Sequence, residues 1–321
     1  SVKSLDLVDY ASFIEVPGSS ALSPINSLNP YMFTSAADLL ELCSKEKLTI
    51  GEIMKRREYC LSDKETTFRK MQNVLEVMRK ETSEPLRNPQ SSLGGFIGGE
   101  AQKIETGAQR YAQSLIGSVQ TDAVARAMAV LERSASMGVI VAAPTAGSAG
   151  VVPGAILAVA DHLHTETKEI HDALFCAAAI GQLLSANACV AGAEGGCQAE
   201  VGSAAAMASA ALVQMIGGSP EQCFHAASIT LGNLLGLVCD PIGGLVEVPC
   251  QNRNAIGIAA AFSSAQLALS GITSLVPFDE MAHVMLEVGH ALPSTLRETA
   301  LGGIAQAPSA KQACRNCSAC R

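Results

Sequence analysis

The chain has few aromatic and basic residues and no long apolar run. It contains no Trp, four Tyr and eight Phe, and 30 Asp and Glu outnumber 22 Lys and Arg, which gives a net charge of −8. Binding nucleic acid needs a concentrated basic surface, so this composition argues weakly against a general nucleic-acid binder, and we expect no nucleic-acid partner. Polar residues interrupt each apolar stretch before it reaches the roughly 20 residues of a membrane span, so we expect no membrane helix.

The chain does have enough apolar material for a large core. Its 321 residues are 48% hydrophobic, with a mean hydropathy of +0.27, which excludes a mostly disordered protein. This length allows one large domain or two smaller ones. The sequence begins at Ser1 and not at Met, so its natural start is open.

Eleven cysteines are an unusual number for a chain that shows no secretory signal. An odd count in a chain that can bury its own core favours reduced thiols over a disulfide framework, and we expect a cytoplasmic protein. Five cysteines lie in helical sequence and are predicted to pack as small buried residues: Cys43, Cys60, Cys176, Cys189 and Cys223.

The first 90 residues predict an extension followed by a small helical subdomain. Residues 1–32 are rich in Pro, Gly, Ser and Asn and are interpreted as an extension or linker. Residues 33–90 then predict three helices, one from Ser35, a second capped by Thr49 with Glu52 in a capping box, and a third over 63–80. We expect a break at 84–89.

The remainder predicts a core of buried Ala-rich helices with Gly-rich loops, over residues 91–305, followed by a Cys-rich tail at 306–321. The only segment with a strand pattern is Val139 to Ala142, so the predicted fold class is an all-α compact bundle with Gly-rich active-site loops. The helices are expected at 121–137, 171–191, 202–217, 221–237 and 254–272.

Four segments concentrate glycine, polar residues and cysteine: 94–103, 144–154, 187–202 and 237–254. Backbone N–H groups of the first could cradle an anion at a helix start, or the loop could be a plain connector. The second offers two hydroxyls for a carboxylate or phosphate, and a structural turn is the alternative. Three cysteines of the last two segments stand in turn contexts, where a sulfur can face a metal: Cys197, Cys239 and Cys250. Their spacing alone does not establish ligation.

The same segments resemble the catalytic alpha region of iron–sulfur L-serine dehydratases. The family pattern GAE-x-GC-Q-x-E-VG, then LGL-x-CDP, then PC-x-x-RN, occurs here with the same distances between the three cysteines. The similarity extends from about Pro30 to Gly303 and includes the PTAGS loop at 144–148 and the end motif at 298–303.

The resemblance implies a [4Fe-4S] cluster on Cys197, Cys239 and Cys250, with one iron left open as a Lewis acid for the substrate hydroxyl. It further implies deamination of a small amino acid, L-serine, to pyruvate and ammonia without pyridoxal phosphate. The family has a second, beta region that we do not find here, so we expect a separate beta subunit or an incomplete chain, and an oligomer. Residues 33–305 then correspond to the catalytic domain.

The resemblance also suggests roles for individual residues. We assign substrate binding to Gly98, Gly99, Thr145 and Ser148, and the catalytic candidates are Lys103, Thr145, Ser148, Asn187 and Glu194. Gln198, Glu200 and Arg253 are expected near the cluster, since charges in apolar surroundings should be paired or functional. The base is not assigned among His162, His164, His171, His225, His283 and His290, or it belongs to a partner chain.

This chain departs from the family at several positions. Ile97 replaces a Thr of the Gly-rich loop, Glu100 replaces an Asp, and Ser134 replaces an Asn. The tail cysteines Cys314, Cys317 and Cys320 allow a zinc or auxiliary cluster site, a resting-state ligand to the open iron, or a disordered reduced tail. Two rival functions remain at this stage: a cluster-dependent cysteine desulfidase and a non-catalytic helical subunit.

Overall fold

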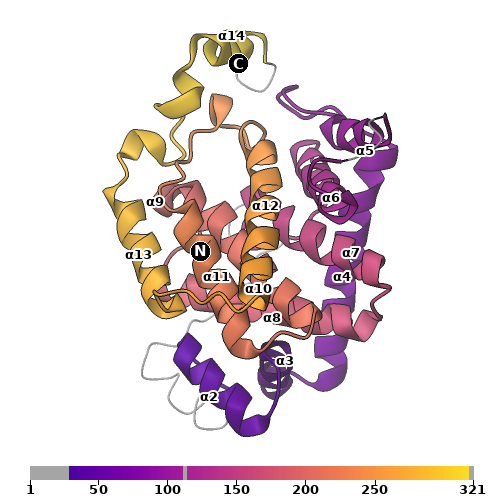
Figure 1. Ribbon diagram of the computed structural model, residues 1–321. Coiled ribbons are helices and arrows are strands. Elements are labelled where there is room, and N and C mark those ends of the chain that lie inside the picture. The colour runs from indigo at the N-terminus through magenta and orange to yellow at the C-terminus, as the bar shows by residue number, and fades with distance from the viewer. Residues whose placement is uncertain (1–28, 111–113, 318–321) are drawn as a thin grey trace, which may run out of the picture.

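The protein is built of helices stacked around one central helix (Figure 1). The computed structural model describes residues 29–110 and 114–317, and within these ranges it contains no β-strand. The predicted all-α fold class is therefore confirmed. The α-helices are α2 (Ala36–Glu46), α3 (Ile50–Leu61), α4 (Lys64–Arg87), α5 (Glu100–Arg110), α6 (Ser118–Ala135), α7 (Val151–Leu163), α8 (Thr167–Asn187), α9 (Gly192–Gly195), α10 (Ser203–Met215), α11 (Pro220–Leu234), α12 (Cys250–Leu269), α13 (Phe278–Ala291) and α14 (Pro308–Asn316).

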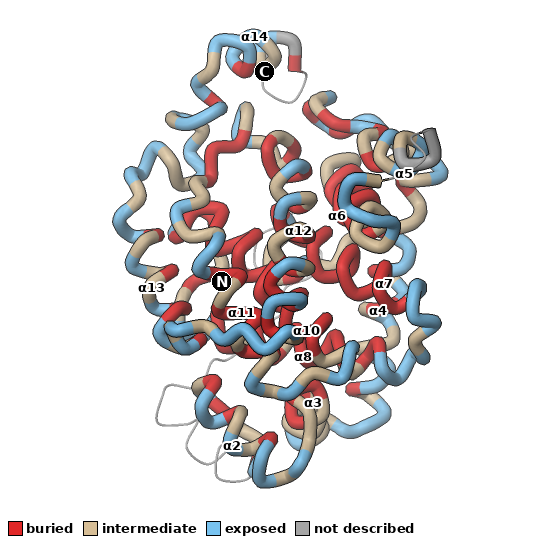
Figure 2. Tube along the Cα trace, viewed as in Figure 1, coloured by how far each residue is buried: buried red, intermediate tan, exposed pale blue. Residues whose placement is uncertain are grey.

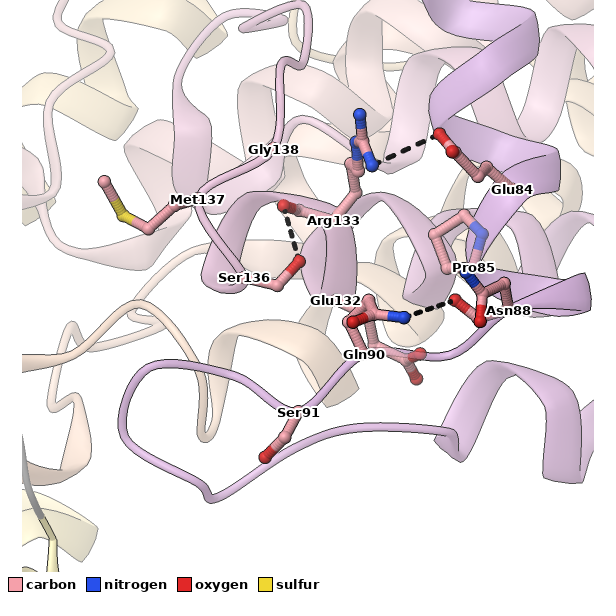
Figure 3. Close-up of a pocket in the computed structure, with 10 residues that line it drawn as sticks. All are labelled: Glu84, Pro85, Asn88, Gln90, Ser91, Glu132, Arg133, Ser136, Met137 and Gly138. Carbon is pink, nitrogen blue, oxygen red and sulfur yellow. Dashed lines mark hydrogen bonds and ion pairs between the residues drawn. The ribbon is translucent and has the colours of Figure 1, made fainter.

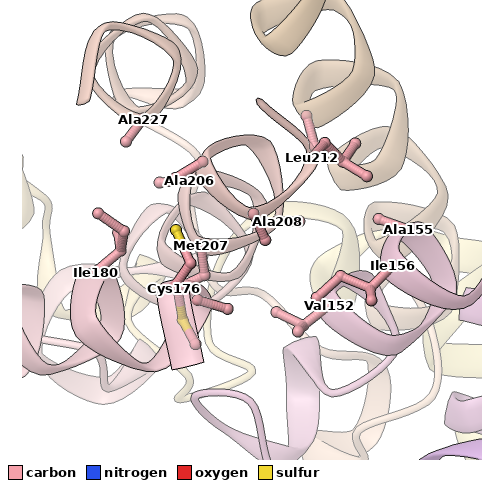
Figure 4. Packing of buried hydrophobic residues seen from close by; sticks show 14 of the residues in the cluster. Val152, Ala155, Ile156, Cys176, Ile180, Ala206, Met207, Ala208, Leu212 and Ala227 are labelled. Carbon is pink, nitrogen blue, oxygen red and sulfur yellow. The ribbon is translucent and has the colours of Figure 1, made fainter. Parts of the chain in front are cut away.

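Helix α10 is the central element. Every residue from Ser203 to Val213 is buried, and α7, α8, α11 and α12 all pack against it (Figure 2). Six of those eleven residues are Ala, whose small side chain lets neighbouring helix axes approach closely. Figure 4 shows Val152 and Ile156 of α7 on one side of this packing and Ile180 of α8 on the other. The Ala-rich sequence thus accounts for a densely packed helical centre.

The N-terminal helices begin close to the predicted positions, and the predicted capping box at Thr49 is confirmed. The Ser35 hydroxyl accepts the N–H of Asp38, and the Thr49 hydroxyl accepts the N–H of Glu52, in two complete capping boxes. The buried residues of α2, α3 and α4 belong to the same hydrophobic cluster as those of α6 to α13.

Two local predictions are wrong. Helix α4 does not end at residue 80 before a break at 84–89 but continues to Arg87 with Pro85 inside it, because Glu81, Thr82 and Pro85 are buried and packing holds the last turn. The segment Val139 to Ala142 pairs with no strand in the described structure, because the Val141 N–H donates to the Glu81 carboxylate at 2.7 Å. The Glu81 side chain thus accepts the hydrogen bond that a neighbouring strand would accept in a sheet.

Helix α7 was not expected from the sequence, although it follows directly after the PTAGSAG loop. Pro153 lies in its first turn, where a missing N–H costs nothing, and its residues from Val151 to Ala160 are all buried. By length and composition, residues 146–163 could cross a membrane, yet 78% of them are buried inside the structure. That burial identifies them as part of the protein core.

Helix α13 was also not expected from the sequence. It packs against α11, on the side of the bundle opposite to α7 (Figure 1).

Candidate functional site

Three thiols from distant parts of the chain meet at one end of α12. Cys197 precedes η3, a π-helical turn at Gln198–Gly202, Cys239 follows α11, and Cys250 is the first residue of α12. Their exposed fractions are 1%, 3% and 4%. Cys197 and Cys239 pack in one buried cluster with Val201, and Cys250 lies near enough to Cys197 for their charges to interact. The structure thus brings these three predicted residues together.

Glycines make room around these sulfurs. Gly196 has φ +74°, a conformation that L-residues with side chains rarely adopt, and it turns the chain into Cys197. A Cβ added at Gly192 would lie 3.1 Å from the Cys239 sulfur and 2.6 Å from Glu200 Oε2. The GAEGGC sequence is therefore needed for the close approach of backbone and sulfur.

The pKa values of the three thiols diverge. A thiol–thiol hydrogen bond from Cys239 stabilises the Cys197 thiolate and so lowers the pKa of Cys197, and the Arg253 guanidinium beside it acts in the same direction. The same thiol–thiol bond, together with burial, raises the pKa of Cys239, and burial raises that of Cys250. Cys197 is thus the most readily ionised of the three and the first candidate to become a thiolate ligand.

The donor set suits an iron–sulfur cluster better than a single ion. Within residues 29–110 and 114–317, no three Cys, His, Asp or Glu side chains converge closely enough to hold one metal ion. A cluster attaches each thiolate to a different iron, so its ligands need not converge on one point. Three buried thiols beside an arginine and a helix N-terminus provide soft, ionisable donors for such a cluster.

Two predicted substrate residues lie next to the thiols. The Thr145 hydroxyl donates to Glu200 Oε1 at 2.7 Å and lies 3.2 Å from the Ser148 hydroxyl, while Glu200 Oε2 accepts from the Cys239 thiol at 3.8 Å. Burial raises the pKa of Glu200, and the Thr145 hydrogen bond partly opposes this rise. Hydroxyls, carboxyl and thiol thus form one continuous hydrogen-bonded group.

Asn254 joins the hydroxyl loop to the helix that carries Cys250. Its side chain is fully buried, accepts the Gly150 N–H at 3.1 Å, and donates to the carbonyls of Gly147 and Cys250 at 2.8 Å each. The PTAGS and PC-x-x-RN motifs therefore position each other.

Arg253 and Asp240 connect the thiol site to the C-terminal segment. The guanidinium donates to Asp240 Oδ1 and to the Val238 carbonyl, both at 2.7 Å, and Asp240 Oδ2 accepts the Ile304 N–H. The backbone of Cys239 also pairs with residues 296 and 298. The end motif at 298–303 is thus held against the cysteine that follows α11.

The Gly-rich loop is anchored by a residue that sequence reasoning missed. Glu247, 2% exposed, accepts from the Ser92 hydroxyl at 2.6 Å, the Gly94 N–H at 2.7 Å and the Phe96 N–H at 3.1 Å. The available signal was a charged residue inside the apolar run before Cys250. Ile97 is buried at 5%, so this replacement of the family Thr points into the protein interior.

The remaining loop candidates already have protein partners. The Gly98 N–H donates to the Glu100 carboxylate at 2.5 Å, and Lys103, whose side chain is 73% exposed, pairs with the same carboxylate. Gly99 has φ +94° and is buried beside Pro89. The Gly98 N–H, which was predicted to bind a substrate anion, is thus already bound to the Glu100 carboxylate.

Several other candidates have their polar groups bound elsewhere in the fold. The Asn187 amide donates to the Thr34 carbonyl, and Gln198 joins the backbones of Met285 and Gly236. Glu194 is exposed, and its carboxylate lies 3.5 Å from the His290 ring.

The other histidines have partners or positions away from the thiols. His283 pairs with Glu287, and His225 accepts the Ser274 N–H. His171 is buried against Phe68, and His162 and His164 lie in exposed positions at the end of α7.

One of the five cysteines that were predicted to be buried is exposed. Cys43, Cys176, Cys189 and Cys223 are buried as predicted, but Cys60 is exposed near the end of α3. The C-terminal tail contains helix α14, which ends just before Cys317 (Figure 1). This helix packs against η4 (Ile242–Gly244), a turn that lies between Cys239 and Cys250 in the sequence. Cys314 is half-buried and Cys317 buried, and Cys320 lies outside the described residues.

Comparisons with known proteins identify the family of this chain. The family described as serine dehydratase alpha chain matches residues 45–305. The chain is 44% identical over 283 residues to the probable L-serine dehydratase alpha chain of Bacillus subtilis, covering 88% of this chain and 94% of that one. It is 43% identical to the L-serine dehydratase alpha chain of Peptoniphilus asaccharolyticus, over 85% and 94% of the two chains. With L-serine dehydratase 2 of Escherichia coli it shares 36% identity, over 86% of this chain and 62% of that protein. The chain therefore belongs to the serine dehydratase alpha-chain family of enzymes.

Proposed function

We propose that this protein is the catalytic alpha subunit of a [4Fe-4S]-dependent L-serine ammonia-lyase, a carbon–nitrogen lyase that converts L-serine to pyruvate and ammonia. The observation that carries the proposal is the meeting of Cys197, Cys239 and Cys250 beside a group of hydroxyls and a buried carboxyl. The names of the relatives support the substrate.

The three thiols would hold the cluster, one iron each, and the fourth iron would supply a Lewis acid for the poorly leaving substrate hydroxyl. The proposal requires no pyridoxal phosphate. Arg253, held by Asp240, keeps a positive charge beside Cys197 and so favours its thiolate form.

The chain's own polar groups would orient the substrate. The Thr145 and Ser148 hydroxyls lie together in the loop before α7, and Glu200 accepts from both the Thr145 hydroxyl and the Cys239 thiol. Ser148 and Glu200 are buried and Thr145 is half-buried, so little water competes for these groups, which strengthens each hydrogen bond to a bound amino acid. These residues therefore bind and position, and the base that removes the α-proton is left to another group.

A beta subunit and an oligomeric assembly complete the proposal, and we place the enzyme in the cytoplasm. The word "alpha chain" in the names of the Bacillus and Peptoniphilus relatives supports a separate partner subunit.

The proposal is tested by purifying the full chain without oxygen and reconstituting it with iron and sulfide, with and without a beta subunit. We expect about four irons per chain and pyruvate and ammonia formed in equal amounts from L-serine. Sulfide released from L-cysteine, measured in parallel, separates serine from cysteine as the preferred substrate. An iron-loaded assembly that makes no pyruvate from L-serine would refute the function.

A further inference from the structure

A polar cavity of about 480 Å³ lies between the end of α4, the residues that follow it and the end of α6 (Figure 3). Its volume is within the range of small-molecule pockets. No residue of the thiol site lines it, so the two sites are distinct. The lining residues are Glu84, Pro85, Asn88, Gln90, Ser91, Glu132, Arg133, Ser136, Met137 and Gly138.

One buried carboxylate oxygen in this wall lacks a partner. Glu132 is 1% exposed, and its Oε1 accepts the Ala101 N–H at 2.8 Å and the Gln251 amide at 3.0 Å. Its Oε2 has no hydrogen-bond partner in the part of the chain that the structure describes. A buried acceptor without a donor is costly, so this oxygen is a place for a donor from outside the protein.

The charges of the cavity favour a cation. Arg133 and Glu84 form an ion pair at 3.2 Å, so Glu132 adds a second carboxylate against a single guanidinium. A bound ammonium group would supply both the missing positive charge and the N–H donors that the free oxygen needs.

Gln90 is the side chain that a ligand would move. Gln90 and Glu132 both line the cavity (Figure 3), and the hydrogen bond from the Gln90 amide to the Asn88 carbonyl is long, at 3.5 Å. Because this bond is weak, a ligand in the cavity displaces the amide at little cost.

We propose that this cavity is a second ligand site, which binds a small molecule through a primary ammonium group with the Glu132 carboxylate as its acceptor. A simple amine and an amino acid share this chemistry. A ligand bound in this cavity would also affect the position of the thiol site. Glu132 accepts hydrogen bonds from Gln251, the neighbour of Cys250, and from Ala101, which follows the Gly-rich loop. The binding itself does not depend on the proposed reaction.

The test measures binding to the full chain by NMR or calorimetry at constant ionic strength. Methylammonium and tetramethylammonium are compared, since both are cations but only the first has N–H donors. A variant with Cys197, Cys239 and Cys250 all changed to Ser excludes a contribution from the thiols. Ethanolamine, L-serine and L-lactate then show whether an amine alone or an amino acid is bound more tightly.

We expect methylammonium to bind and tetramethylammonium not to bind. Glu132→Gln keeps the acceptor for Ala101 but turns the free oxygen into a donor, so affinity should fall at least about tenfold. Ser91→Phe fills the cavity without touching Glu132 and should weaken binding as much. Glu76→Gln, on the exposed face of α4, is the matched control and should bind as the unchanged chain does.

Equal binding of the two cations, equal affinity in Glu132→Gln and the control, or no binding by any of the amines would overturn the proposal. If Glu132→Gln does not fold, as judged by circular dichroism, Ser91→Phe decides by the same criteria. A chain that binds amines here but forms no pyruvate would retain this site and refute the proposed function instead.

Discussion

Thr145 donates its hydroxyl to the Glu200 carboxylate at 2.7 Å, across 55 positions of sequence. Because Glu200 also accepts from the Cys239 thiol, this single bond links the hydroxyl loop before α7 to the three-thiol site. The loop is thereby fixed at both ends, here by Glu200 and at Gly150 by Asn254.

Removing that bond should impair catalysis more than folding. Thr145→Val keeps the shape but not the donor, so we expect kcat/KM for L-serine to fall at least about tenfold, the worth of a hydrogen bond to a charged acceptor. The measurement is pyruvate formation by the reconstituted enzyme. Thr106→Val, on the exposed face of α5, is the control and should be unaffected. Equal losses in both variants would deny Thr145 a role at the site.

The Glu247 carboxylate should control the mobility of the Gly-rich loop. Glu247→Gln replaces one acceptor oxygen by a donor that faces N–H groups, and we expect a cost of about 1–3 kcal/mol in unfolding free energy. Amide hydrogen exchange at Gly94 and Phe96 should accelerate, because both N–H groups donate to this carboxylate. Unchanged exchange at these two amides would show that the loop is held by other contacts.

Glu81 should make stability fall as pH rises. Burial raises the pKa of this carboxyl from 4.5 to about 8, so the folded protein holds a proton that the unfolded chain has already released. Unfolding free energy should therefore decrease between pH 4.5 and about 8, by roughly 1.4 kcal/mol for each unit of the pKa difference that is realised. Urea unfolding of Glu81→Gln should lack this decrease. A parallel pH dependence in the two proteins would contradict the assignment.

Substituting alanine at Gly150 and at Gly107 should change the stability of the protein in opposite directions. A Cβ at Gly150 would lie 2.1 Å from the Ala127 carbonyl oxygen, whereas Gly107 in α5 has open space around it. We expect Gly150→Ala to destabilise the protein by several kcal/mol through this clash, and Gly107→Ala to stabilise it by about 0.5–1 kcal/mol. Thermal unfolding of both variants checks this. A neutral Gly150→Ala would show that α6 and α7 can separate without cost.

What the sequence could predict depended on local signals. The capping residue Thr49 acts on its own helix, so its position could be predicted from the sequence. The partners of Glu81, Glu247 and Asn187 lie 60 to 155 residues away, and no local pattern encodes such pairs. Burial of Pro85 likewise overrode a local break signal. The cysteine motif was recognisable because its turn residues and thiols are adjacent in sequence, although which thiol ionises first required the fold.

The most direct test of the central claim is the iron and sulfide content of single cysteine variants, purified and reconstituted without oxygen. We predict that Cys197→Ser, Cys239→Ser and Cys250→Ser each lose the cluster and its visible absorption, whereas Cys60→Ser, an exposed thiol near the end of α3, retains about four irons per chain. Full iron content in all three site variants would contradict the account.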